Sequence, residues 1–323
     1  MIPPKSPICL LFCLGSAIIW DFPTERMKFM KKYLSFLIVL ALCLTMGACS
    51  HAPCAQVAAT TLPVYQFTTA ITQGTPITVT RLVTQSVSCL HDYTLTVDQM
   101  RAIEGAQVVV ISGAGLEEFM AEPLSKADRV VDASSRISLL EPHEHDHEEE
   151  AVPSHHHHES DPHIWLSPKN AAVMASNICA GLTEEYPQHS QIFEENLRQL
   201  TQQLETLDAY GAQQLDALSC RELITFHDGF GYLADAYDLH ILEAIEEDSG
   251  SEASAGELTH LIRLAADHHL PAIFTEVNGA VSAASIISAS ADIPVYALDM
   301  AMAGDDYFAA MYRNIDTLKE ALQ

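Results

Sequence analysis

Short apolar segments alternate with amphipathic ones along residues 56–133. Runs rich in β-branched and other apolar residues, such as 77–83, predict strands, and segments with helical spacing of apolar residues predict helices. The predicted strands are 56–64, 77–83, 107–112 and 129–133, and the predicted helices are 65–71, 96–104 and 116–126. Strands that alternate with helices in this way predict a parallel sheet covered by helices.

The pattern changes between His189 and Leu218, where apolar residues recur every three or four positions and form one stripe of a long helix. The stripe residues are Phe193, Leu197, Leu200, Leu204 and Leu207. A helix of this length would reach about 45 Å, more than one small domain needs. We therefore predict that it joins two lobes. The alternative is a core helix that ends in a loop at Gly211.

Alternation of strands and helices resumes after this helix. The predicted strands are 222–226, 240–245, 271–275 and 294–298, and the predicted helices are 229–237, 254–268, 280–289 and 305–322. We expect an α/β protein of two lobes, each with a mostly parallel sheet covered by helices, joined by one long rigid helix. The lobes would span 49–187 and 219–323, with the linking helix over 188–218.

Residues 27–48 begin with several lysines and continue as an apolar run that ends in small residues before Cys49. This pattern predicts a signal peptide, and the cysteine after Gly-Ala resembles a bacterial lipobox. We expect cleavage before Cys49 and acylation of its thiol, with an uncleaved signal anchor as the alternative. Residues 1–26 precede this signal, so we expect them to be an extension upstream of a true start at Met27 or Met30.

The segment 141–162 holds seven histidines and eight carboxylates. Imidazole and carboxylate groups are ligands of divalent transition metals, and neutral imidazole suits zinc. Because the segment has few apolar side chains, we predict a solvated loop. Its histidines are His143, His145, His147, His155, His156, His157 and His158. The alternatives are a purification tag or a charged loop without a ligand role. The H-E-x-x-H match at 143–147 lacks the apolar helix that a metalloprotease needs.

Acidic residues dominate once residues 1–48 are removed, because 11 basic and 41 acidic residues remain, a formal charge of −30. Such a surface repels nucleic acid and attracts cations, so we expect no nucleic-acid partner. Besides Cys49 the cysteines are Cys54, Cys89, Cys179 and Cys220, without C-x-x-C spacing. A thiolate zinc site is therefore disfavoured. Disulfides within the first two or the last two are possible, with free thiols as the alternative.

Isolated polar residues follow three predicted strands of the second lobe: His227, Glu276 and Asp299. Ligands bind outside the carboxyl ends of strands in open parallel sheets, so these side chains should face one crevice. In the first lobe His91 follows the strand that ends at residue 83, and His163 follows the histidine-rich loop. Imidazoles and a carboxylate from two lobes could complete a zinc tetrahedron.

Several strings of residues strengthen this interpretation. D-P-H-I-W-L-S-P at 161–168 and F-H-D-G-F-G-Y-L at 226–233 resemble two motifs of the zinc-binding proteins of bacterial ABC importers, the metal-specific solute-binding cluster. H-D-Y at 91–93 resembles the first ligand segment of that family, and Leu298-Asp299 with G-D-D-Y at 304–307 resembles the last. The resemblance covers residues 57–322 and includes the acidic histidine-rich loop.

The resemblance implies four metal ligands, His91, His163, His227 and Asp299. Manganese-binding relatives typically have glutamate where His227 stands, so this histidine favours zinc. Leu90 and Met300 replace prolines that usually adjoin the first and last ligands. These departures leave Glu276, or a water molecule, as alternatives for the fourth position.

The resemblance also implies a function. A lipid-anchored monomer outside the cytoplasmic membrane would capture Zn²⁺ in a cleft between its lobes and deliver it to an ABC permease driven by an ATPase. The histidine-rich loop would collect metal. The chain would not be an enzyme. The alternatives are a surface zinc buffer or adhesin, a manganese-binding member of the same family, and a zinc hydrolase with Glu276 or Asp228 as its base.

Overall fold

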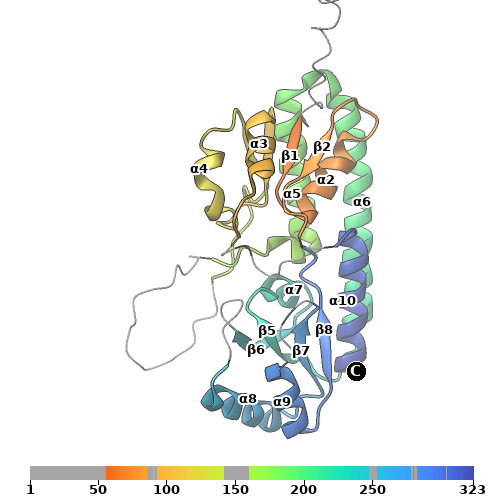
Figure 1. Cartoon of the computed structure of the whole chain (residues 1–323). Helices are drawn as coiled ribbons and strands as arrows, with labels where there is room; N and C mark the ends of the chain where they lie inside the picture. The colour runs from red at the N-terminus through yellow and green to blue at the C-terminus, as the bar shows by residue number, and fades with distance from the viewer. Residues whose placement is uncertain are drawn as a thin grey trace, which may run out of the picture. The chain divides into compact units, whose positions relative to one another are not determined.

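The computed structural model describes residues 56–85, 90, 93–141, 160–246, 253–277, 279, 282–302 and 304–323 (Figure 1). The chain divides into two compact units, Met1–Pro53 and Cys54–Gln323, and the described residues belong to the second. Several predicted features lie outside the described residues: residues 1–26, the signal peptide 27–48, Cys49, Cys54, Cys89, His91 and the histidines of the 141–162 loop. Within the described part, no helix combines the length and apolar character that a membrane span needs.

Four parallel strands form the sheet of the first lobe, in the order β2-β1-β3-β4. The strands are β1 (Val57–Ala59), β2 (Val79–Arg81), β3 (Val108–Ile111) and β4 (Val130–Asp132). The helices between and after them are α2 (Leu62–Thr72), α3 (Val97–Gly105), α4 (Ala121–Leu124) and α5 (Pro168–Glu185), with 3₁₀ turns η1 (Glu118–Met120), η2 (Ile164–Leu166) and η3 (Pro187–His189).

Strand β1 is shorter than the predicted segment 56–64, because α2 begins at Leu62. Pro63 explains the difference: proline has no N–H to donate to a sheet, and its fixed φ suits the first turn of a helix. Helix α5 was not predicted at all. The Ser167 side chain accepts a hydrogen bond from the Asn170 amide at its start, and Pro168 occupies its first turn. Such a start signal could have identified this helix.

Helix α6 (Ser190–Leu215) is 26 residues long and packs against α2 and α5 in the first lobe and α10 in the second (Figure 1). The predicted joining helix is therefore confirmed. The alternative of a helix ending at Gly211 is wrong, since Gly211 is buried within α6. A Cβ at Gly211 would lie 2.3 Å from Cζ of Tyr237, so glycine allows the Tyr237 ring to pack directly on the helix.

The second lobe repeats the arrangement, with a parallel sheet of order β6-β5-β7-β8. The strands are β5 (Glu222–His227), β6 (His240–Glu246), β7 (Ile273–Glu276) and β8 (Val295–Leu298). The helices are α7 (Gly231–Ala236), α8 (Ala255–Asp267), α9 (Ser282–Ala291) and α10 (Tyr307–Leu322). The predicted fold class, two helix-covered parallel sheets joined by one long helix, is confirmed.

The segment between β8 and α10 lies against the first lobe. The Arg81 guanidinium donates to the carbonyl oxygens of Met302 and Gly304 at 2.9 and 2.7 Å. The Trp165 indole N–H donates to the Met300 carbonyl at 2.8 Å, and the Tyr307 hydroxyl donates to the Trp165 carbonyl at 2.7 Å. These bonds, of which the two made by Trp165 are buried, attach the segment that follows Asp299 to the lobe that carries His163.

Cys179 and Cys220 are both free thiols, so the disulfide considered between them is not formed. They lie in different lobes: Cys179 is buried in α5, and the Cys220 thiol donates to the Glu222 carbonyl at the start of β5. Burial raises the pKa of the Cys179 thiol. Both cysteines therefore agree with the alternative of free thiols, and Cys179 is buried.

Candidate metal centre

His163 and His227 come from different lobes and meet edge to face. His163 precedes η2, and His227 is the last residue of β5. Their Nε2 atoms are 3.4 Å apart, and their ring centroids are 5.1 Å apart at 85°. The side chains are almost fully buried, with 2% and 6% of their surface exposed. The two histidines predicted to face each other from the two lobes therefore lie together.

The spacing of the two nitrogens fits a metal ion. Tetrahedral zinc binds imidazole nitrogen at about 2.0–2.1 Å, which puts two such nitrogens roughly 3.3–3.4 Å from each other. The observed Nε2–Nε2 distance is 3.4 Å. The distance between the two nitrogens therefore suits two ligands on one cation.

Asp161 fixes the orientation of His163. Its Oδ1 atom accepts from the backbone N–H of His163 at 2.9 Å and lies 2.8 Å from His163 Nδ1. A carboxylate beside Nδ1 stabilises the tautomer that carries its proton there, so the lone pair is on Nε2. This is the arrangement in which a histidine coordinates metal through Nε2.

Tyr232 of α7 holds the backbone on which Asp161 lies. Its hydroxyl accepts from the Leu140 amide at 2.9 Å and donates to the Asp161 carbonyl at 3.1 Å. The Asp161 amide in turn donates to the Leu140 carbonyl at 3.0 Å. Burial raises the pKa of Tyr232 to about 12, so the hydroxyl keeps its proton at neutral pH. Leu140 and Asp161 are thus hydrogen-bonded to each other, and Asp161 lies two positions before His163.

Glu276 ends β7 and is 6% exposed. Its Oε1 lies 3.8 Å from Nδ1 of His227, the ring nitrogen opposite the one that faces His163. This distance is longer than that of a hydrogen bond. Gly229 leaves room for the His227 ring and the Met300 side chain, because a Cβ there would lie 2.6 Å from His227 Cδ2 and 2.8 Å from Met300 Cε.

Asp299 directly follows β8, and both of its carboxylate oxygens have partners within the second lobe. Oδ1 accepts from the Ala301 amide at 2.8 Å, and Oδ2 accepts from the Arg313 guanidinium at 3.0 Å. The Asn314 side chain bonds the backbone N–H and carbonyl of Asp299 at 2.8 and 2.7 Å. Across the described ranges, no three His, Cys, Asp or Glu side chains are grouped to hold one metal ion. Of the three predicted ligands that the structure describes, His163, His227 and Asp299, it brings the two histidines together.

Sequence reasoning missed the supporting residues Tyr232, Arg313 and Asn314, and it did not assign a role to Asp161. Asp161 had a signal, because it lies two positions before His163 within the same motif. Arg313 and Asn314 lie on α10, 14 and 15 residues after Asp299, and no local pattern marks them.

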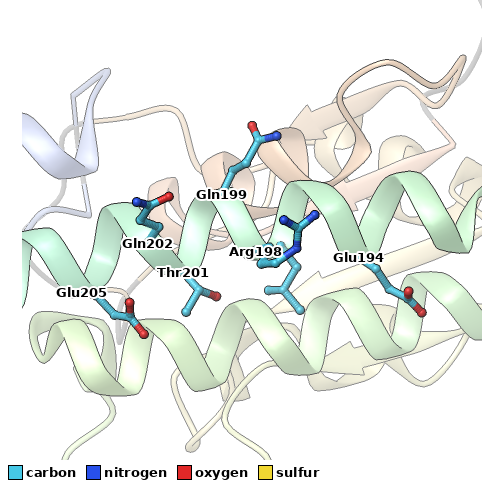
Figure 2. A pocket seen from close by; sticks show the side chains of 7 residues that line it. Glu194, Arg198, Gln199, Thr201, Gln202 and Glu205 are labelled. Atoms are coloured by element: carbon cyan, nitrogen blue, oxygen red, sulfur yellow. The ribbon is translucent and has the colours of Figure 1, made fainter.

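A separate surface hollow lies along α6 (Figure 2). Its lining residues all come from that one helix: Glu194, Leu197, Arg198, Gln199, Thr201, Gln202 and Glu205. It offers no imidazole or thiolate, so it does not compete with the histidine pair as a zinc site.

Comparisons with known proteins identify the family of this chain. Residues 57–321 match the family model described as "Zinc-uptake complex component A periplasmic". The zinc-binding lipoprotein AdcA of Streptococcus pneumoniae (strain ATCC BAA-255 / R6) is 28% identical over 312 residues, which cover 90% of this chain and 61% of AdcA. A putative metal-binding protein of Treponema pallidum (strain Nichols) is 30% identical over 241 residues, 72% of this chain and 76% of that protein. This chain therefore spans about three fifths of AdcA.

Solved structures show the same fold. A crystal structure of ZnuA superposes with a TM-score of 0.72 at 28% identity, covering 83% of this chain and all (100%) of that one. The Zn(II)-bound AdcA of Streptococcus pneumoniae superposes with a TM-score of 0.69 at 25% identity, covering 82% of this chain and 57% of that one. The resemblance inferred from the motifs is confirmed. The chain belongs to the family of the periplasmic component A of the zinc-uptake complex.

Proposed function

We propose that this protein binds Zn²⁺ between its two lobes and delivers it for import. The observation that carries the proposal is the buried pair of His163 and His227, whose Nε2 atoms are 3.4 Å apart. Membership of a zinc-uptake family, and relatives named as zinc-binding, support zinc as the cargo. His227 also supports zinc over manganese, because imidazole suits zinc while carboxylate oxygen suits manganese.

The proposed ligands are His91, His163, His227 and Asp299, with Glu276 as the alternative fourth ligand. Zinc would draw the first-lobe histidines and the second-lobe groups onto one ion. Asp161 keeps the His163 lone pair on Nε2, so the ion meets a ligand that is already oriented. The histidine-rich segment would act as a weak collector of metal, since unstructured ligands lose entropy when they bind.

The partners follow from the importer complex to which the family belongs. We propose an ABC permease and its ATPase as the recipients of zinc, and a monomer held outside the cytoplasmic membrane by a lipid on Cys49. A lipoprotein among the relatives supports the anchor. The chemistry required is binding and release, so no catalytic role is assigned. The comparisons do not favour the zinc buffer, manganese or hydrolase alternatives.

Calorimetry of Zn²⁺ and Mn²⁺ binding to the purified protein tests the proposal. We expect one tight zinc site that survives deletion of residues 142–159 and is weakened at least 100-fold, about 2.7 kcal/mol, by His163→Ala or His227→Ala. His240→Ala is the matched control, since His240 is an exposed histidine on the edge strand β6 of the second lobe. Unchanged zinc affinity in both cleft variants, or a tight site lost with the deletion, would refute the proposed site.

A further inference from the structure

Asp299 is held by two neighbouring residues of α10 that contact different parts of it. Asn314, 1% exposed, bonds both backbone groups of Asp299. Arg313 bonds only the carboxylate, at 3.0 Å from Oδ2. The Arg313 side chain is 62% exposed and that of Asp299 is 18% exposed. The backbone of Asp299 is therefore fixed from the core, while its carboxylate is paired with a side chain at the surface.

The partners of the carboxylate limit how it can bind a metal ion. A zinc-bound carboxylate oxygen lies about 2.0–2.2 Å from the ion. Each carboxylate oxygen has two lone pairs, so a hydrogen bond occupies one acceptor position and part of the negative charge on which zinc would draw. The Oδ1 bond to the Ala301 amide spans two residues of one turn. Oδ2 accepts from Arg313, a long and exposed side chain that can move without a change in the backbone. Of the two oxygens, Oδ2 is the one that can exchange its partner readily.

We propose that Arg313 is a positioning residue that competes with zinc for the Asp299 carboxylate, and so lowers zinc affinity and speeds zinc release. The inference rests on the proposed function, with Asp299 as a ligand. A transport protein must give up its cargo as well as capture it, and a cation that recovers the carboxylate as zinc leaves favours release. The Asn314 contacts keep Asp299 in place during the exchange, because they involve its backbone alone.

Competition can be separated from simple charge repulsion. A guanidinium also repels Zn²⁺ through space, and that effect does not need Asp299. Competition for the carboxylate does need it. The two accounts therefore differ in a variant that lacks the Asp299 charge, and a double-mutant cycle between the two positions measures the difference.

The experiment measures zinc affinity by competition with a chromophoric chelator, and zinc release by stopped flow, for Arg313→Gln, Asp299→Asn and the double variant. Exposed ion pairs contribute modestly, so we expect Arg313→Gln to bind zinc about two- to five-fold more tightly and to release it more slowly by a similar factor. Asp299→Asn should bind more weakly. Adding Arg313→Gln to Asp299→Asn should change nothing further. Arg313→Lys, which keeps the charge, should have a zinc affinity close to that of wild type.

Lys319→Gln is the matched control, because it removes a positive charge from the same helix, where Lys319 bonds the Gln214 side chain. An unchanged or weakened affinity in Arg313→Gln would overturn the inference, and so would an equal gain in the Asp299→Asn background. Thermal unfolding with a chelator present checks that each variant is folded. If His163→Ala leaves zinc binding intact, the proposed function fails. If His163→Ala and Asp299→Asn weaken binding while Arg313→Gln has no effect, only this inference fails.

Discussion

Asp161 allows a quantitative test of how the cleft is organised. Its Oδ1 atom lies 2.8 Å from His163 Nδ1 and accepts from the His163 backbone N–H at 2.9 Å. The His163 side chain is 2% exposed and that of Asp161 9%, so water screens this pair little. Loss of such an outer partner of a ligating histidine typically lowers metal affinity 10- to 100-fold, about 1.4–2.7 kcal/mol.

Two substitutions separate the contribution of the Asp161 charge from that of its acceptor oxygen. Asp161→Asn retains an acceptor oxygen for both donors but loses the charge, and charge-assisted hydrogen bonds are about twice as strong as neutral ones. We therefore expect about a ten-fold loss of zinc affinity. Asp161→Ala removes the acceptor, leaves the buried Nδ1–H without this partner and lets the ring change tautomer. Its loss should approach about 100-fold.

Zinc affinity is measured by chelator competition at pH 7.5, with circular dichroism of each variant as a check of folding. Asp235→Asn serves as the control, since Asp235 is an exposed carboxylate on α7, in the same lobe as His227. Affinity in Asp161→Ala within two-fold of wild type would refute the argument that Asp161 orients a ligand. An equal loss in Asp235→Asn would show that net charge, and not orientation, is responsible.

Three further predictions concern residues around the cleft and in the first lobe. Tyr232→Phe removes the hydroxyl that bonds Leu140 and Asp161, so zinc affinity should fall about two- to ten-fold with little change in fold. An unchanged affinity would mean that the hydroxyl does not help to hold Asp161. Tyr307→Phe leaves the buried Trp165 carbonyl without its 2.7 Å partner and should lower the free energy of unfolding by about 1–3 kcal/mol in urea titrations; a neutral effect would show that another donor replaces it. Burial raises the pKa of Glu117 from 4.5 to about 7 against the hydrogen bonds that it accepts. The folded protein therefore holds a proton on Glu117 that the unfolded chain releases, so wild type should lose stability as the pH rises from 4.5 to about 7. Urea unfolding with a chelator present should show a smaller loss in Glu117→Gln. Parallel pH profiles would contradict that assignment.

The fold class could be predicted from the amino-acid sequence, because the relevant signals are local. Alternating strands and helices predict a parallel sheet whatever their distant neighbours are. The apolar stripe from Phe193 to Leu207 needs only a helical period, and it becomes the buried face of α6. The boundaries were less accurate where a local signal was overlooked, at Pro63 in α2 and at the Ser167-Pro168 start of α5.

The sequence also predicted a candidate site, since imidazoles at strand ends and in recognisable motifs indicate zinc ligands. His163 and His227 meet as predicted. His91 and the histidines of the 141–162 segment, the most conspicuous feature of the composition, lie outside the described residues.

Tertiary structure alone decided what surrounds each candidate ligand. Tyr232 lies 71 residues from Asp161, and Arg313 lies 14 residues from Asp299, on a helix that follows a loop. No periodicity or motif links such positions, because their contact depends on how a helix packs on a sheet and on how the two lobes meet. Residue types predict which metal is bound. The hydrogen bonds of Asp161 to His163 and of Arg313 to Asp299 arise only from the packing of the folded chain.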